Sequence, residues 1–175
     1  MLSVLAASDG FLVRPAHDPA RKAGDIVQVV DLAALDKTLS DVTVGGAAVP
    51  ALVAVMAANN ETGVIFPTEE IGAIVKEHGA VYHVDAVQTA GKLALDVARS
   101  TADLVSISGH KIHACKGVGA LYVRRGTKLR PLIVGGHQER GRRAGTENVS
   151  GLVGLGVACD LSVAHRDDEN TRVRG

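Results

Sequence analysis

The feature that most constrains the fold is a recurring order in which a short apolar run leads into a polar cluster. Residues 51–56 form a continuous apolar run that ends at the polar residues 59–63. Residues 80–84 and 102–107 are also short, largely apolar stretches that polar side chains follow. Runs of this length are typical of strands buried on both faces. Helical spacing in the longer stretches makes the whole pattern typical of an α/β domain.

Four further segments complete the predicted order of elements. A helix is expected at residues 30–40, capped by Asp31, because its leucines share one face: Leu32, Leu35 and Leu39. A second helix should begin at Thr68 and stop at Gly79, with acidic residues in its first turn. A strand at residues 119–123 should run antiparallel to its neighbour, and a last helix is expected to include residues 160–174.

Composition excludes several classes of function. The chain has 175 residues, enough for one domain with a core, and 46% of them are hydrophobic. Lysine plus arginine equals aspartate plus glutamate at 19 each, and only 2% of residues are aromatic. A nucleic-acid partner or an anionic membrane surface is therefore disfavoured.

The termini and the two cysteines point to the same compartment. Residues 1–7 are apolar but short and lack a basic leader, so they resemble neither a signal peptide nor a membrane span. Cys115 and Cys159 lack the number and spacing of a zinc site, and no metal site is expected. We therefore expect reduced thiols and a cytoplasmic location.

Three polar clusters should meet at one place. They are residues 59–61, 85–88 and 108–111, and each follows a predicted strand. In an open parallel sheet the carboxyl ends of adjacent strands form one ligand crevice. Separate segments of the chain are therefore expected to contribute to a single site.

The side chains of these clusters suit pyridoxal phosphate (PLP). This aldehyde cofactor needs an amine for a Schiff base, an acid beside its pyridinium nitrogen and donors for its phosphate. Lys111 could supply the amine, Asp85 the acid, and Ser108 with His110 the phosphate donors. Gln88 could bond to the ring hydroxyl as a neutral amide. On spacing alone, a surface lysine and a turn-forming aspartate remain the commoner interpretation.

Four longer motifs carry a more specific resemblance. In chain order they are residues 56–63 (MAANNETG), 82–88 (YHVDAVQ), 108–111 (SGHK) and 140–148 (RGRRAGTEN). The chain resembles the cysteine desulfurases, within the class V aminotransferase-like PLP enzymes. The implied fold is the central portion of a fold-type I PLP-dependent transferase large domain, a mainly parallel α/β sheet with helices on both faces.

The resemblance implies a role for each matching residue. Lys111 would be the catalytic residue and would carry the cofactor, Asp85 would pair with the pyridine nitrogen, and Gln88 would meet the ring hydroxyl. Asn60 would lie by the cofactor and the substrate carboxylate. The implied activity converts L-cysteine to L-alanine and passes sulfur on as an enzyme persulfide, for iron–sulfur cluster assembly or another sulfur-transfer pathway.

The residues that would bind the phosphate imply a homodimer. Ser108 and His110 would hold the phosphate, and Thr146 matches a family threonine that reaches the phosphate in the neighbouring subunit. A homodimer with composite sites is therefore implied, as is a protein partner that accepts the sulfur, such as an iron–sulfur scaffold. A selenocysteine lyase, another class V lyase or a non-catalytic fragment would show nearly the same residues.

The chain departs from the family in its outer parts. We interpret residues 1–175 as a partial PLP-binding large domain without the small C-terminal domain. The sulfur-accepting cysteine of the family follows the Thr146 segment on a mobile loop, at a position beyond residue 175. Neither Cys115 nor Cys159 matches it, and an apolar helix around Cys159 would keep that thiol inert.

We therefore expect little or no turnover of L-cysteine by the 175-residue chain. The reason is the lack of a matching acceptor thiol for the substrate sulfur. Sulfide and alanine should be measured after addition of L-cysteine and PLP, with and without a reductant. Robust turnover would contradict this expectation and would implicate Cys115 or Cys159.

Overall fold

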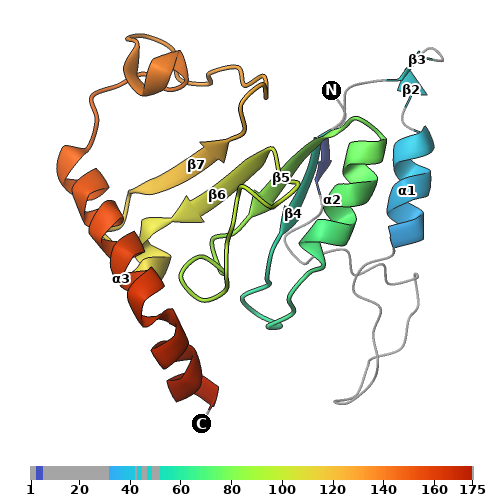
Figure 1. Cartoon of the computed structure of the whole chain (residues 1–175). Coiled ribbons are helices and arrows are strands. Elements are labelled where there is room, and N and C mark those ends of the chain that lie inside the picture. The colour runs from blue at the N-terminus through green and yellow to red at the C-terminus, as the bar shows by residue number, and fades with distance from the viewer. Residues whose placement is uncertain (1–2, 6–31, 42, 45–46, 49–51, 175) are drawn as a thin grey trace.

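A computed structural model describes residues 3–5, 32–41, 43–44, 47–48 and 52–174 of the chain. Its centre is a five-stranded sheet with the strand order β1-β4-β5-β6-β7 (Figure 1). Strands β4 (Leu52–Met56), β5 (Val81–Asp85) and β6 (Leu104–Ser108) are parallel, and β7 (Gly119–Val123) is antiparallel to β6. The predicted mainly parallel sheet is confirmed.

The register of the parallel strands fixes where each polar cluster begins. Asp85 lies opposite Met56 of β4 and opposite Ser106 of β6. Two backbone bonds continue this alignment past the strand ends: Ala57 N donates to Asp85 O at 2.8 Å, and Ala86 N donates to Ser106 O at 2.9 Å. The segments that follow β4 and β5 therefore leave the sheet at the same edge.

The predicted strands agree with the observed ones to within two residues. The largest shift is in β6, which begins at Leu104 although residues 102–107 were predicted. Just before it, Asp103 lies in a bend, and the carbonyl of Ala102 accepts a bond from Arg124 Nε instead of from a strand backbone.

The three helices were also expected from the sequence. They are α1 (Leu32–Asp41), α2 (Thr68–Glu77) and α3 (Val149–Arg174). Helix α2 begins at the predicted Thr68, and Gly79 follows it in the left-handed conformation with φ +64°, which glycine adopts without strain. The predicted cap of α1, Asp31, lies outside the described residues.

Three short strands were not predicted. Strand β1 (Ser3–Leu5) pairs in parallel with β4 at the edge of the sheet. Strands β2 (Thr43–Val44) and β3 (Ala47–Ala48) form a separate antiparallel pair. Runs of two or three residues are too short for a periodic pattern to identify.

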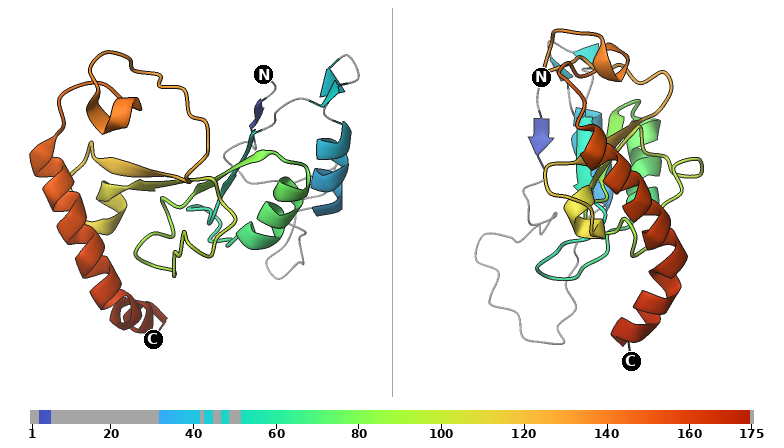
Figure 2. Two further views of the ribbon diagram at one scale, coloured as in Figure 1. Left: turned by 45° about the horizontal axis from the view of Figure 1, so that its top comes forward. Right: turned by 90° about the vertical axis from the view of Figure 1, so that its left-hand side faces the viewer.

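Helix α2 packs against one face of the sheet, and α1 packs against α2. Leu35 and Leu39 of α1 and Ile71 and Val75 of α2 belong to one buried cluster. The sheet contributes alternate residues to the same cluster, namely Val53, Val55, Tyr82, Val84 and Val105. Ile107, next in this alternation, contacts both this cluster and a second one beneath α3. The right-hand view of Figure 2 accordingly shows α2 and α3 on the same side of the sheet.

The opposite face of β5 and β6 carries polar residues. Side chains alternate along a strand, so this face receives His83 and Asp85 from β5 and Ser106 and Ser108 from β6. All four are half-buried. The sheet thus has an apolar face toward the described helices and a polar face near the ends of its central strands.

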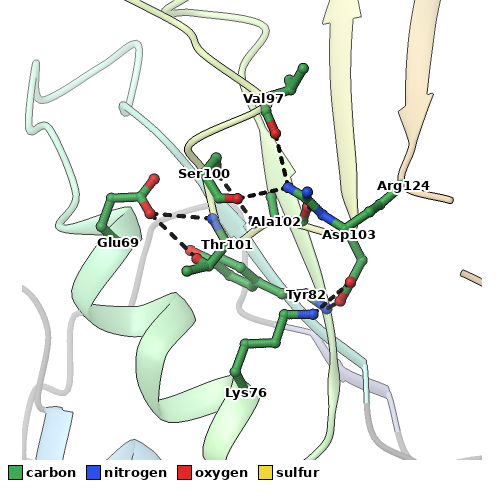
Figure 3. A network of polar contacts seen from close by, with 9 residues as sticks. All are labelled: Glu69, Lys76, Tyr82, Val97, Ser100, Thr101, Ala102, Asp103 and Arg124. Atoms are coloured by element: carbon green, nitrogen blue, oxygen red, sulfur yellow. Dashed lines mark hydrogen bonds and ion pairs between the residues drawn. The ribbon is translucent and has the colours of Figure 1, made fainter. Parts of the chain in front are cut away.

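A polar network fastens the connection between β5 and β6 (Figure 3). The carboxylate of the buried Asp103 accepts bonds from Lys76 Nζ at 2.5 Å and from Tyr82 N at 2.9 Å. Arg124, just after β7, donates to three carbonyl oxygens of this connection, those of Val97, Ser100 and Ala102. The network ties α2, β5, β6 and β7 together from the end of the sheet opposite the polar clusters.

Within the described residues, no helix combines the length and the apolar character needed to cross a membrane.

Replacing Asp103 with Ala should lower the free energy of unfolding by about 2–3 kcal/mol, because the buried Tyr82 N–H and Lys76 lose their acceptor. Asp36→Ala is the matched control, since this exposed carboxylate pairs only at the surface with His78. We expect it to cost less than about 0.5 kcal/mol. Urea denaturation measures both values, and equal losses for the two variants would contradict the structural role of Asp103.

Candidate functional site

The structure brings the polar clusters after β4, β5 and β6 to one edge of the sheet, as expected from the sequence. The first is a tight loop after β4, the second a helical turn after β5, and the third the short helix η1 (Gly109–Ile112) after β6. This edge is the candidate site.

In the loop after β4, the buried residue is Asn59 and the exposed one is Asn60. The Asn59 side-chain oxygen accepts bonds from the backbone N–H groups of Glu61 and Thr62, both at 2.9 Å. Asn59 therefore shapes the loop that presents Asn60 to solvent. Its structural role was not anticipated, although an asparagine at the start of a polar loop is a common turn former.

Asp85 ends β5 with its side chain half-buried. One carboxylate oxygen accepts a bond from Val87 N at 2.9 Å, so Asp85 forms the turn that begins the next segment. A carboxylate has about four acceptor positions on two oxygens, which leaves capacity for a ligand. Gln88, also half-buried, lies in this turn.

Ser108 and His110 are held together at the end of β6. Ser108 Oγ and His110 Nδ1 are hydrogen bonded at 2.8 Å. Gly109 lies between them because a Cβ there would come within 2.9 Å of the carbonyl oxygen of Val118. The Val118 backbone, just before β7, thus explains why the SGHK motif has a glycine at this position. The short connection through Gly109 keeps the hydroxyl and the imidazole side by side.

Lys111 occupies the third position of η1 and lines a cavity of about 610 Å³ between η1 and α3. Its lining combines apolar residues, such as Ile112 and Val157, with charged ones that include Lys92, Arg166 and Glu169. Asp85, Gln88 and Ser108 are not among its lining residues. The backbone of Lys111 is therefore next to the Ser108–His110 pair, but its side chain is turned toward α3.

The environment of this cavity lowers the pKa of the Lys92 amine. Burial lowers the pKa of the Lys92 amine, and the positive charge of Lys111 lowers it further. The two lysines therefore lie close enough for their like charges to interact. An anion placed between them would relieve this repulsion.

Thr146 lies outside the three segments that directly follow β4, β5 and β6. It is exposed in the segment between η2 (Gln138–Gly141) and α3. Figures 1 and 2 show this segment's η2 end on the far side of β7 from η1. This position is compatible with the predicted contact to a neighbouring subunit, which stays a prediction.

The two cysteines differ in environment. Cys115 is exposed in the loop after η1, whereas Cys159 is partly buried and packs against the cluster of Ile112, Leu155 and Ala158 beneath α3. In the described part of the chain, no three His, Cys, Asp or Glu residues are grouped so as to hold a metal ion.

The sequence interpretation missed His83 and Ser106. His83 Nε2 and Ser106 Oγ are hydrogen bonded at 3.1 Å on the polar face of the sheet. Ser106 is the register partner of Asp85. The available signal was the alternation of polar residues along each strand, which placed His83 on the face of Asp85 but did not pair it with Ser106.

Together, this edge offers an anionic carboxylate, a hydroxyl–imidazole pair and an amine on the adjacent turn. Such a set can pair with a protonated ring nitrogen, bind a phosphate and react with an aldehyde.

A family model and individual relatives both place the chain among the class V aminotransferases. The family model described as aminotransferase class V matches residues 13–171. A cysteine desulfurase of Gluconacetobacter diazotrophicus is 62% identical over 124 residues, which cover 71% of this chain and 31% of the relative. The cysteine desulfurase NifS of Azotobacter vinelandii is 54% identical over 123 residues, covering 70% of this chain and 31% of NifS.

Solved structures agree with the relatives. A NifS-like protein from Rickettsia africae superposes with a TM-score of 0.74 at 36% identity, covering 79% of this chain and 38% of that one. The structure of SspA in complex with cysteine superposes with a TM-score of 0.64 at 40% identity, covering 72% and 36%. The chain thus spans about a third of the length of the proteins it matches.

Replacing Lys111 with Met should raise the pKa of Lys92, because the substitution removes the like charge that destabilises the Lys92 ammonium. NMR titration of the lysine side-chain carbons measures the change. Lys116→Met, an exposed lysine outside the cavity lining, is the control and should leave the Lys92 titration unchanged. If the pKa of Lys92 is the same in Lys111→Met as in the wild type, the two amines are not neighbours.

Proposed function

Because this chain belongs to the class V aminotransferase family, we propose that it is the cofactor-binding part of a PLP-dependent cysteine desulfurase. Such an enzyme converts L-cysteine to L-alanine and passes the sulfur on as a persulfide. The observation that carries the proposal is the SGHK turn, which places Lys111 directly after the Ser108–His110 pair, beside the strand that ends in Asp85. The desulfurase names of the relatives support the substrate.

The side chains at this edge fit PLP. A phosphate accepts hydrogen bonds, and the Ser108 hydroxyl and the His110 imidazole are already adjacent and can both donate. A protonated ring nitrogen needs an anion, and Asp85 is a half-buried carboxylate on the neighbouring strand. Lys111 lies in the 3₁₀ helix η1 that directly follows Ser108, so its amine is next to this pair along the chain.

Each residue then has a defined task. Asp85 would keep the ring nitrogen protonated, Gln88 would bond the ring hydroxyl, and Asn60 would orient the cofactor and the substrate carboxylate. Bound PLP supplies an electron sink for the charge left when the α proton of the amino acid departs. The amine of Lys111 would bind the cofactor aldehyde and, once free, move that α proton.

The side chain of Lys111 must turn away from α3 to do this. It now lines the cavity shared with Lys92, while Asp85 and Ser108 lie outside that lining. Lysine has a flexible four-carbon stem, and the charge of Lys92 favours its departure from the cavity. Cofactor binding would therefore select a Lys111 rotamer that faces the strand ends.

The wider assembly belongs to the same proposal. A homodimer would allow Thr146 of one subunit to reach the phosphate bound by the other, and its exposed position favours this. A cytoplasmic location and a sulfur-accepting partner, such as an iron–sulfur scaffold, complete the proposed setting. A selenocysteine lyase would use the same residues, and competition between L-cysteine and L-selenocysteine distinguishes the two.

The test is a PLP titration followed by absorbance. The chain should develop the violet-edge band of PLP bound to a lysine, and borohydride should fix the cofactor on Lys111, as peptide mass analysis can show. Lys111→Ala should abolish the band, because Lys111 is the lysine that directly follows the Ser108–His110 pair. Lys128→Ala, an exposed lysine after β7, is the control and should keep it. A band that survives Lys111→Ala, or no band in the wild type, would refute the proposal.

A further inference from the structure

A polar pair lies beside Asp85 that none of the proposed roles uses. His83 precedes Asp85 on β5 and projects from the same face of the sheet. Its Nε2 atom is hydrogen bonded to Ser106 Oγ at 3.1 Å, and Ser106 lies opposite Asp85 in the register of β5 and β6. His83, Ser106 and Asp85 thus form one cluster across two strands.

The cluster is anchored from both sides. The backbone oxygen of Ser106 accepts a bond from Ala86 N at 2.9 Å, and the backbone oxygen of Asp85 accepts one from Ala57 N at 2.8 Å. The His83–Ser106 bond adds a side-chain link between β5 and β6 at the level where Asp85 ends its strand. Lateral movement of the β5 end, and with it of the Asp85 carboxylate, would have to break this link.

The charge state of His83 suits this position. Burial lowers the pKa of the imidazole, an effect that the Asp85 carboxylate partly opposes. The ring is therefore neutral at pH 7, and its hydrogen bond to Ser106 is retained without a positive charge beside Asp85. A cation at this place would compete with a protonated ring nitrogen for the same carboxylate.

We propose that His83, held by Ser106, is a positioning residue that keeps the Asp85 carboxylate in place and free of a competing cation for the cofactor ring. The inference rests on the proposed function for the identity of the ring. The coupling between His83 and Asp85, however, exists in the chain without any cofactor and is measurable there.

The first measurement uses the cofactor-free chain. NMR titration should find the pKa of His83 below the ordinary value of 6.5, and Asp85→Asn should lower it further by removing the stabilising negative charge. Asp36→Asn, at the distant His78 contact, is the control and should leave the His83 titration unchanged. The proposal is wrong if the pKa of His83 has its ordinary value, or if Asp85→Asn leaves that pKa unchanged.

The second measurement compares PLP affinity among three substitutions of His83. His83→Gln can still bond to Ser106 and should bind PLP within about twofold of the wild type. His83→Leu removes one hydrogen bond and should weaken binding about tenfold, the equivalent of roughly 1.4 kcal/mol. His83→Lys adds a cation beside Asp85 and should weaken binding more than His83→Leu does.

Thermal unfolding of the same variants separates positioning from stability. If PLP affinity follows the melting temperature instead of the order Gln, Leu, Lys, His83 is only structural and the proposal is wrong. A wild-type chain that fails to form the Lys111 band refutes the proposed function, and the cofactor-free titration then decides alone whether His83 and Asp85 are coupled. His78→Leu, remote from the cluster, should leave PLP affinity unchanged.

Discussion

The parallel register of β4, β5 and β6 is the constraint on which the rest of the structure depends. It aligns Met56, Asp85 and Ser106 in one row across the sheet. Because side chains alternate along each strand, a slip by one residue would turn Asp85 from the polar face to the apolar core. Buried residues such as Tyr82 and Val84 oppose that slip, so the hydrophobic core on one face holds the polar cluster on the other.

The far end of the sheet supports the same register. Asp103 bonds to the backbone of Tyr82 and to Lys76, and Arg124 binds the carbonyls that precede β6. These contacts fix where β6 begins, and its length then fixes where Ser108 and η1 emerge. The network drawn in Figure 3 thus helps to determine the position of the SGHK turn, although none of its members belongs to that turn.

Charge is distributed differently on the two sides of η1. On the strand-end side lie the Asp85 carboxylate and the neutral His83, whereas the cavity toward α3 is lined by Lys92, Lys111 and further basic residues together with Glu169. Lys111 is at the boundary between these regions. Its side chain can therefore respond to whichever partner is present, an anion near α3 or an aldehyde near the strand ends.

By itself, the sequence determined the order of the main elements, the parallel strands that lead to one edge and the residues that form the SGHK turn. These follow from local patterns, since apolar runs and turn residues act over a few positions. Only the tertiary structure decided that Asn59 and not Asn60 is the buried loop former, that His83 pairs with Ser106, and that the side chain of Lys111 is turned toward α3. Each of these depends on packing between segments far apart in the chain, and a local pattern carries no information about which rotamer or cross-strand partner such packing selects.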